Sequence, residues 1–337
     1  MDTSDVIILF IIKYLINVMP KVSIIVPVYG VEKYIERCAC SLFEQTLDDL
    51  EFIFVDDSSP DDSIEKLQTL ILKYPNRIPQ VRIIRHDVNR GLPAARQTGI
   101  SVASGDYIIH CDSDDWIDLD LCETLYLKAS ENSLDVVIYN YKTTDGSNIL
   151  SVYSGGHSHD RDFCINAMMH QQMWWSLCNK MFKRSLYENE IVYPKDGMGE
   201  DMCLCLQLFF YCSKIDYVDK YYYYYSNSTS IIQNKSEENC LSKFLQINRN
   251  VDILINFYEK VFLSERFNKG LNYLKYNAKF PLIPILGQKK YYKLWLNTYS
   301  GCEWGVFFDC YASIKERIRA LLVIMRLYPL PRNKYQN

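Results

Sequence analysis

Three carboxylates crowd one short segment in the first half of the chain. Asp112, Asp114 and Asp115 fall within four residues, directly after the apolar stretch Tyr107–Ile109. Like charges at that spacing repel one another, and removing them from water is costly unless a positive group compensates. Carboxylate oxygens suit a hard divalent cation, so a metal ion that holds a phosphate is one interpretation. A solvated acidic turn or helix cap is the alternative.

A second acidic pair stands at a comparable place upstream. Asp56 and Asp57 directly follow the apolar segment Phe52–Val55. In an open α/β sheet, ligands bind outside the carboxyl ends of the strands. Two acidic strand ends at one edge of a sheet therefore favour a binding site over two unrelated loops.

Apolar runs that alternate with amphipathic segments indicate the elements that must position these acids. We expect strands over residues 22–29, 51–55, 81–85 and 105–109, and helices over 31–45, 61–74 and 94–103. Strands that alternate with helices predict an α/β fold with a parallel sheet. Further on we expect a helix over 119–130, a strand over 136–141, a polar loop or hairpin over 143–158, a helix over 202–211 and a strand over 215–225. From about residue 238 the pattern is helical.

Composition limits the class of protein. The chain has 337 residues, a formal net charge of -4 and twelve cysteines. The acidic balance argues against a nucleic-acid-binding protein. The cysteines lack zinc-ribbon spacing, and several lie in apolar runs, so free thiols in a reducing cytosol fit best. The apolar run Val6–Met19 is short for a membrane span, and we expect residues 1–20 to be an extension with little part in the fold.

The turns after the strands exclude two common nucleotide sites. No GxGxxG follows the first strand, which counts against a nicotinamide or flavin enzyme, and no GxxxxGK[ST] loop is present. A nucleotide on this sheet would have to be held by side chains and a metal.

Four blocks taken together resemble the inverting family 2 glycosyltransferases with a GT-A fold. They are VSIIVPVYGVEKYI, FIFVDDSSPDDS, NRGLPAARQTGISVASGDYIIHCDSDDW and the later GED. The resemblance implies a Rossmann-like, mostly parallel sheet flanked by helices in a catalytic domain over residues 21–235, and a helical C-terminal region over 236–337. It also implies a nucleotide-sugar donor, Mn²⁺ or Mg²⁺, and inversion at the anomeric carbon. The implied setting is polysaccharide or lipid-linked glycan synthesis on the cytoplasmic face of a membrane.

The resemblance also carries over residue by residue. It implies that Pro27, Val28 and Tyr29 wall the pocket for the base, and that Arg96 lies near the nucleotide or the sugar. Asp56 would accept a hydrogen bond from the base, with Asp57 as the second candidate. The remaining donor-binding positions belong to the DxD motif: Asp112 toward ribose and metal, Ser113 between, and Asp114 as the firmer metal ligand.

Asp201, in the ED pair, stands at the position of the general base. A sugar hydroxyl is a poor nucleophile, and a carboxylate within hydrogen-bond reach can take its proton during attack. The alternative is that Glu200 and Asp201 are acids in the first turn of a helix, where they favour the helix dipole.

Other residues leave open choices. Trp174 and Trp175 could stack on an acceptor sugar or pack in the core, and Tyr225 or Ser230 could contact the diphosphate. His157 and His159 suit a surface loop better than a metal site. The apolar stripe Ile314, Ile318, Leu321, Leu322 and Met325, on a predicted helix over 313–330 with basic neighbours, suggests either peripheral membrane contact or docking on the same domain. From another functional class, a non-catalytic nucleotide-sugar or glycan-binding protein would keep the same fold.

Overall fold

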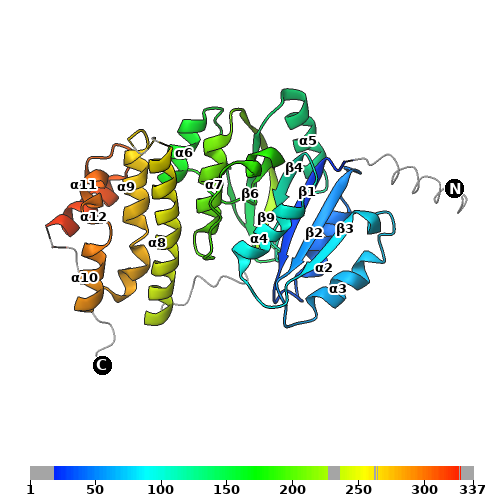
Figure 1. The fold of residues 1–337 in the computed structure, drawn as a ribbon, viewed down its shortest axis with the longest axis horizontal. Coiled ribbons are helices and arrows are strands. Elements are labelled where there is room, and N and C mark those ends of the chain that lie inside the picture. Colours follow the sequence, from blue (N-terminus) through cyan, green and yellow to red (C-terminus); the bar gives the residue numbers. More distant parts are fainter. Residues whose placement is uncertain (1–18, 227–235, 262, 264, 326, 328–337) are drawn as a thin grey trace, which may run out of the picture.

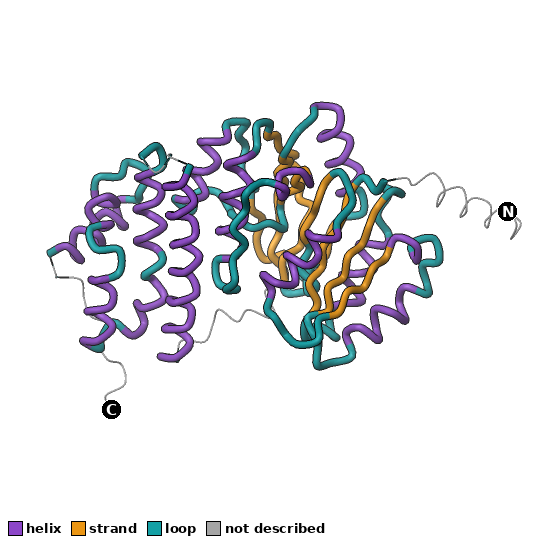
Figure 2. The backbone as a smooth tube through the Cα atoms, viewed as in Figure 1, coloured by secondary structure: helices purple, strands orange, loops and turns teal. Residues whose placement is uncertain are grey.

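The computed structural model describes residues 19–226, 236–261, 263, 265–325 and 327. The predicted N-terminal extension lies outside this part of the chain except for Met19 and Pro20, and so does Ser230. The backbone forms a sheet with helices on both faces, followed by a group of helices (Figures 1 and 2).

The elements are as follows. The strands are β1 (Val22–Val28), β2 (Leu50–Asp56), β3 (Val81–Arg85), β4 (Tyr107–His110), β5 (Trp116–Ile117), β6 (Val136–Thr144), β7 (Ile149–Tyr153), β8 (Lys180–Lys183) and β9 (Ile215–Ser226). The α-helices are α2 (Ile35–Phe43), α3 (Ser63–Ile71), α4 (Leu92–Val102), α5 (Leu121–Asn132), α6 (Arg161–Met169), α7 (Glu200–Tyr211), α8 (Glu237–Lys260), α9 (Asn268–Asn277), α10 (Lys289–Asn297), α11 (Cys302–Phe307) and α12 (Ile314–Ile324). Short 3-10 helices are η1 (Ile78–Gln80), η2 (Arg184–Glu188) and η5 (Phe280–Ile285).

The first half of the sheet is parallel, as predicted. Its order is β3-β2-β1-β4, and β1 pairs with β2 so that Val28 lies opposite Asp56. All residues of β1, β2 and β4 are buried. This burial explains why their sequences read as continuous apolar runs instead of alternating ones. The register brings the carboxyl ends of the strands to one edge.

The second half of the sheet is mixed, whereas the first half is parallel. β8 runs antiparallel to both β4 and β6, whereas β6 and β9 are parallel. The polar segment after β6 forms a hairpin with β7, one of the two predicted alternatives. Because β5 pairs antiparallel with β9, the chain just after the acidic cluster is fixed to the sheet. The α/β class and the helical C-terminal region are confirmed.

Close packing of α4 sets the position of the helix that carries Arg96. A Cβ atom on Gly99 would lie 2.4 Å from the Ile25 side chain, so only glycine allows α4 to approach β1 this closely. Ala95 and Ile100 of the same helix are buried in one core cluster with Ile25 and Ile53. The opposite face of the sheet packs against α2, α3 and α5 in a second cluster.

The helices after β9 pack against α6 and α7, on the side of the molecule away from β3 (Figure 1). The Tyr258 hydroxyl on α8 donates to the carbonyl of Leu206 on α7 at 3.1 Å. His170, at the end of α6, lies 2.7 Å from the buried carboxylate of Asp309. The twelve cysteines are free thiols, and most of them are buried.

The last described helix is shorter than predicted. The face that it buries is also not the predicted apolar stripe. α12 begins after a capping box of Ser313 and Glu316. Its buried side chains are Ala320 and Val323, while Ile314 is 75% and Ile318 53% exposed. The predicted apolar stripe therefore faces outward over much of its length, because the small residues of the helix make the core contact.

Candidate active site

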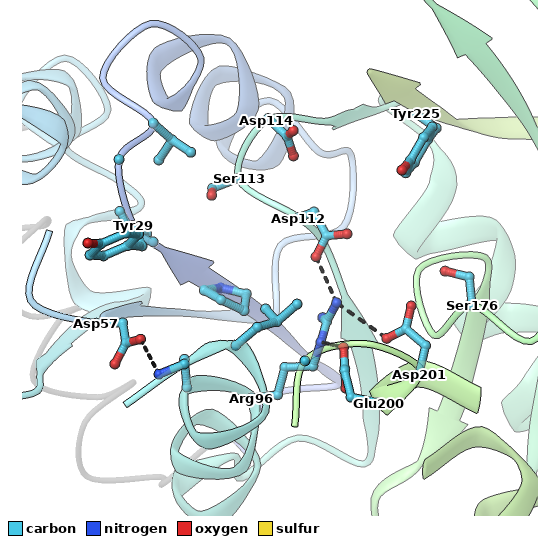
Figure 3. Close-up of a pocket in the computed structure, with 18 of the residues that line it drawn as sticks. Tyr29, Asp57, Arg96, Asp112, Ser113, Asp114, Ser176, Glu200, Asp201 and Tyr225 are labelled. Carbon is cyan, nitrogen blue, oxygen red and sulfur yellow. Dashed lines mark hydrogen bonds and ion pairs between the residues drawn. The ribbon is translucent and has the colours of Figure 1, made fainter. Parts of the chain in front are cut away.

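A pocket of about 730 Å³ opens at the carboxyl ends of the parallel strands. All the predicted site residues except Asp56 line it. The other lining residues come from the turn after β1, from α4 and the turn before it, from the loops before β8 and α7, from the first residue of α7 and from the end of β9. They are Gly30, Val31, Asn89, Gly91, Leu92, Ala95, Trp174, Trp175, Ser176, Gly197, Gly199, Glu200 and Tyr225. Figure 3 shows Tyr29 and Asp57 on one side and Ser176, Asp201 and Tyr225 on the other.

Asp57 anchors the turn that leads into α4. It accepts hydrogen bonds from the backbone N–H groups of Arg90 and Gly91 at 2.8 and 2.7 Å, and it bonds to the His86 ring at 2.7 Å. Gly91 adopts a φ of 87°, which glycine tolerates without strain. The buried carboxylate therefore shapes the turn and also presents an acceptor to the pocket.

Asp56 lies beside the pocket instead of in its wall. Its carboxylate accepts from the N–H of Ser59 at 2.7 Å and pairs with Arg85 at 3.3 Å. Alternation along the strand explains the difference, since successive residues point to opposite sides of a strand. Of the two candidates for the base contact, only Asp57 lines the pocket.

The acidic cluster divides into one structural acid and two that face the pocket. Asp115 is buried, accepting from the Tyr223 hydroxyl and from the N–H of Ser226, both at 2.6 Å. Burial, and then the charges of Asp114 and Asp112, raise the pKa of Asp115 well above its ordinary value. Asp112 and Asp114 are partly exposed and line the pocket.

The backbone of this acidic loop is held from α2. The Arg37 guanidinium donates to the carbonyl of Asp114 at 2.8 Å and lies 3.7 Å from the centre of the Trp116 ring. Two contacts on one side chain fix its position. Arg37 therefore supports the loop that presents Asp114.

Arg96 is the charged centre of the site. Its side chain is buried and pairs with Asp112 and Glu200 at 2.8 Å each, and with Asp201 at 3.5 Å. Burial alone would lower the pKa of Arg96, but Glu200 and then the two aspartates raise it well above its ordinary value. The guanidinium therefore stays charged and links the acidic loop to the start of α7 (Figure 3).

The two acids that open α7 differ in their surroundings. Glu200 is buried, and burial raises its pKa against the opposing charge of Arg96. The Asp201 side chain remains 26% exposed and lines the pocket. The sequence predicts the pair as one motif and gives only Asp201, not Glu200, a place in the site. The position of Glu200 directly before the candidate base Asp201 is the sequence signal that could have placed it in the site.

Trp174 packs against aromatic neighbours and also lines the pocket. Its ring stacks on Tyr141 at a centroid distance of 3.7 Å and meets Tyr225 edge-on at 5.8 Å, and it also lines the pocket. Tyr225, proposed from sequence as a diphosphate contact, lines the pocket as well. His157 stacks on Tyr217 at 4.4 Å, away from the residues that form the pocket.

Two acids of the pocket, Asp112 and Asp114, could contribute to a metal site. Among the described residues, no group of three or more His, Cys, Asp and Glu side chains is arranged to hold an ion by itself. Asp112 and Asp114 share one pocket, so a cation there would need further oxygen ligands from a bound molecule. Within the described part of the chain, no helix combines the length and the apolar character needed to cross a bilayer.

The fold and the acidic pocket at its strand ends define an α/β protein with a ligand site at the carboxyl edge of its sheet. A sequence profile of glycosyl transferase family 2 matches residues 23–194. The chain belongs to this family and is a glycosyltransferase. The resemblance seen in the sequence is therefore confirmed.

Two bacterial relatives illustrate the similarity. The chain is 31% identical over 230 residues to the glycosyltransferase GlyG of Streptococcus pneumoniae serotype 4, and the match covers 63% of this chain and 73% of GlyG. It is 34% identical over 227 residues to EpsH of Bacillus subtilis, and that match covers 64% of this chain and 63% of EpsH.

Solved structures share the fold. The structure of residues 1–349 of S. aureus TarS in complex with UDP-GlcNAc has a TM-score of 0.57 at 18% identity, over 91% of this chain and 89% of that one. The mannosyltransferase PcManGT from Pyrobaculum calidifontis, in complex with GDP-Man and Mn²⁺, has a TM-score of 0.51 at 14% identity, over 92% of this chain and 87% of that one.

Proposed function

We propose that this glycosyltransferase moves a sugar from a nucleotide-diphosphate donor, UDP-linked, to an acceptor hydroxyl with inversion at the anomeric carbon. One observation carries the proposal: Asp112, Asp114 and Asp201 line the same pocket, with the Arg96 guanidinium between the two motifs. A site for a diphosphate and a base for an acceptor are thus available in one cavity.

The nucleotide would lie against the end of β1. Pro27, Val28 and Tyr29 offer an apolar wall, and Tyr29 is half exposed, so its ring is accessible to a base. Asp57 offers an acceptor on the same side, which the N3–H of uracil requires. The complex of TarS with UDP-GlcNAc supports a uridine nucleotide in a protein of this fold.

Asp112 and Asp114 are the residues that would hold Mn²⁺ or Mg²⁺. Their hard oxygen ligands fit either ion, and both side chains are partly exposed to the pocket. A bound divalent cation neutralises the departing diphosphate, so that the leaving group needs no proton. Arg96 holds one oxygen of Asp112 at 2.8 Å, and the Cys178 thiol donates to the other at 3.4 Å.

Asp201 would act as the general base. Its carboxylate lies at the positive end of α7 and reaches the pocket from the side opposite Tyr29 (Figure 3). There it can take the proton of an acceptor hydroxyl as the new bond forms. One base and one displacement reverse the configuration of the anomeric carbon.

The acceptor would be a growing polysaccharide or a lipid-linked glycan, met on the cytoplasmic face of the cell membrane. Exposed apolar side chains on the last helices support this setting. They are Trp304, Phe308, Tyr311, Ile314, Ile318, Met325 and Leu327. Exposed Lys315 lies on the same segment, so the surface suits peripheral contact with anionic lipid.

A donor screen tests the proposal. The protein is incubated with UDP-glucose, UDP-galactose, UDP-N-acetylglucosamine and GDP-mannose, with Mn²⁺, Mg²⁺ or EDTA, and nucleotide diphosphate release is measured. We expect that UDP is released from one of the UDP-sugars and that this release requires the metal. We also expect NMR to show a product whose anomeric configuration is opposite to that of the donor. Full activity in excess EDTA would contradict the metal, and a retained configuration would contradict the displacement.

A further inference from the structure

A buried lysine binds the segment of the pocket wall that includes Ser176, the residue beside Asp201. Lys180 opens β8 with a fully buried side chain, at 0% exposure. Its Nζ donates to the carbonyls of Trp174 and Ser176 at 2.7 and 2.8 Å, and to the Asn179 side-chain oxygen at 2.7 Å. All three protons of the ammonium group are therefore used.

A contribution to the stability of the fold does not explain this arrangement. No carboxylate among the described residues forms an ion pair with Lys180, so neutral oxygens hold its charge. Burial lowers the pKa of Lys180, while Cys205 and then Asp201 act in the opposite direction. A buried ammonium held only by dipoles stabilises less than an apolar side chain of similar size would. The lysine is better explained by what it positions.

Lys180 positions backbone that has no regular structure. Residues 171–179 form neither helix nor strand, so the carbonyls of Trp174 and Ser176 depend on a side-chain donor instead of a regular backbone ladder. Trp174, Trp175 and Ser176 nevertheless line the pocket. Ser176 lies beside Asp201, across the pocket from Tyr29 and Asp57 (Figure 3). The two carbonyls that Lys180 binds bracket this segment from residue 174 to residue 176.

We propose that Lys180 is a positioning residue that holds Trp174–Ser176 in place as the acceptor-side wall of the pocket. The proposal rests on the proposed function, since Asp201 must be the base for its neighbours to face the acceptor. Loss of the three hydrogen bonds of Lys180, which we call the clamp, should disturb acceptor binding. The nucleotide side of the pocket, on β1 and β2, should stay unchanged.

The test compares Lys180→Met with Lys183→Met. Lys183 lies on the same strand, but its side chain is 42% exposed and only 3.7 Å from Asp135 in a surface pair. Amide hydrogen exchange of residues 171–179 is measured first. We expect exchange to quicken at least about tenfold in Lys180→Met and to stay unchanged in Lys183→Met, with β1 unaffected in both.

Kinetics then separate acceptor from donor. Rates are measured with p-nitrophenyl glycosides of glucose, galactose and N-acetylglucosamine as acceptor probes, and UDP affinity is measured by calorimetry. In Lys180→Met, kcat/KM for the acceptor should fall about 10- to 100-fold, with UDP affinity and transfer to water within about twofold. Equal losses on the donor and acceptor sides would overturn the proposal.

Two further results keep the proposal falsifiable. If Lys180→Met does not fold, Asn179→Ala is used instead, because it removes one of the three acceptors of the ammonium group. It should give the same changes in amide exchange and in acceptor kcat/KM, but smaller ones. Unchanged exchange in residues 171–179 for either folded variant would overturn the proposal. The exchange result does not depend on turnover, so failure of the proposed reaction is distinguishable from failure of the clamp.

Discussion

Arg96 joins the two halves of the site through one guanidinium. It contacts Asp112 from the acidic loop and Glu200 and Asp201 from the start of α7. Three carboxylates around one cation leave the cluster short of positive charge. A bound divalent cation would restore the balance, and a proton on buried Glu200 would remove one of the two excess negative charges.

Removal of Arg96 should make stability depend on pH. Arg96→Met is expected to cost about 3–5 kcal/mol near neutral pH, because it leaves buried carboxylates unpaired. Burial already raises the pKa of Glu200, and loss of the opposing charge raises it further. When a carboxyl group has a higher pKa in the folded state than in the unfolded state, its contribution to stability is fully present at pH values below the unfolded-state pKa. That contribution is lost as the pH rises through the folded-state pKa. The gap in melting temperature from wild type should therefore be smallest near about pH 5 and widen toward about pH 8; a constant gap would contradict this account.

Asp114 should be needed for transfer and dispensable for folding. Its side chain is partly exposed at the pocket, so Asp114→Ala should leave the melting temperature close to that of wild type. Transfer should fall at least about 100-fold, since the diphosphate would lose its charge compensation. Asp120→Ala serves as the control, because Asp120 pairs with Lys220 at the surface. Equal activity of the two variants would remove Asp114 from the metal site.

At the scale of elements, two helices determine where the acids meet. Gly99 brings α4 against β1, which buries Arg96 at the strand ends. The loop before α7 is held from outside the sheet: Asn250 on α8 donates to the carbonyls of Asp196 and Met198, both at 2.9 Å. The helical region thereby shapes the approach to Asp201.

Asn250→Ala should impair transfer through this loop. Two partly buried carbonyls would lose their donor, at a cost of about 1–3 kcal/mol in stability. Transfer should fall about tenfold or more because Gly197 and Gly199 line the pocket. Arg249→Ala is the matched control, since its neighbouring exposed pair with Asp196 is worth at most about 1 kcal/mol. If both variants transferred sugar at rates near that of wild type, α8 would have no influence on the active site.

The parallel half of the fold could be predicted from sequence, and the rest only in part. Buried strands such as β1 and β2 give long apolar runs, and Asp57, Asp112 and Asp114 stand directly at such strand ends. β5 has two residues and β8 four, which is too short for a periodic signal. The sequence also cannot show that α4 buries Arg96, or which of Asp56 and Asp57 faces the pocket, because tertiary packing and local turns decide both.

At the scale of the whole molecule, the helices after β9 support the site on one side and present a surface on the other. The predicted apolar stripe of α12 is genuine, yet Ala320 and Val323 make the core contact. Small side chains let α12 lie close to its neighbours. The larger ones, Ile314, Ile318 and Met325, are left mostly exposed.

This surface should bind anionic vesicles. Ile314→Glu combined with Ile318→Glu should abolish sedimentation with phosphatidylglycerol vesicles while melting temperature stays unchanged, because both side chains already face outward. Wild-type binding should weaken with salt and be lost on phosphatidylcholine alone. Leu245→Glu, at another exposed apolar position, is the control. Unchanged vesicle binding by the double variant would assign the surface to a different partner.

The central claim is that Asp201 performs the chemistry, and one variant tests it most directly. Asp201→Asn keeps the size of the side chain, so its folding and UDP affinity should match those of wild type. Transfer from the UDP-sugar used by wild type should fall about 10²- to 10⁴-fold, the usual contribution of a positioned general base. An acid that serves only the start of α7 would cost at most about 1 kcal/mol of stability. Near-normal turnover in Asp201→Asn would therefore contradict the account.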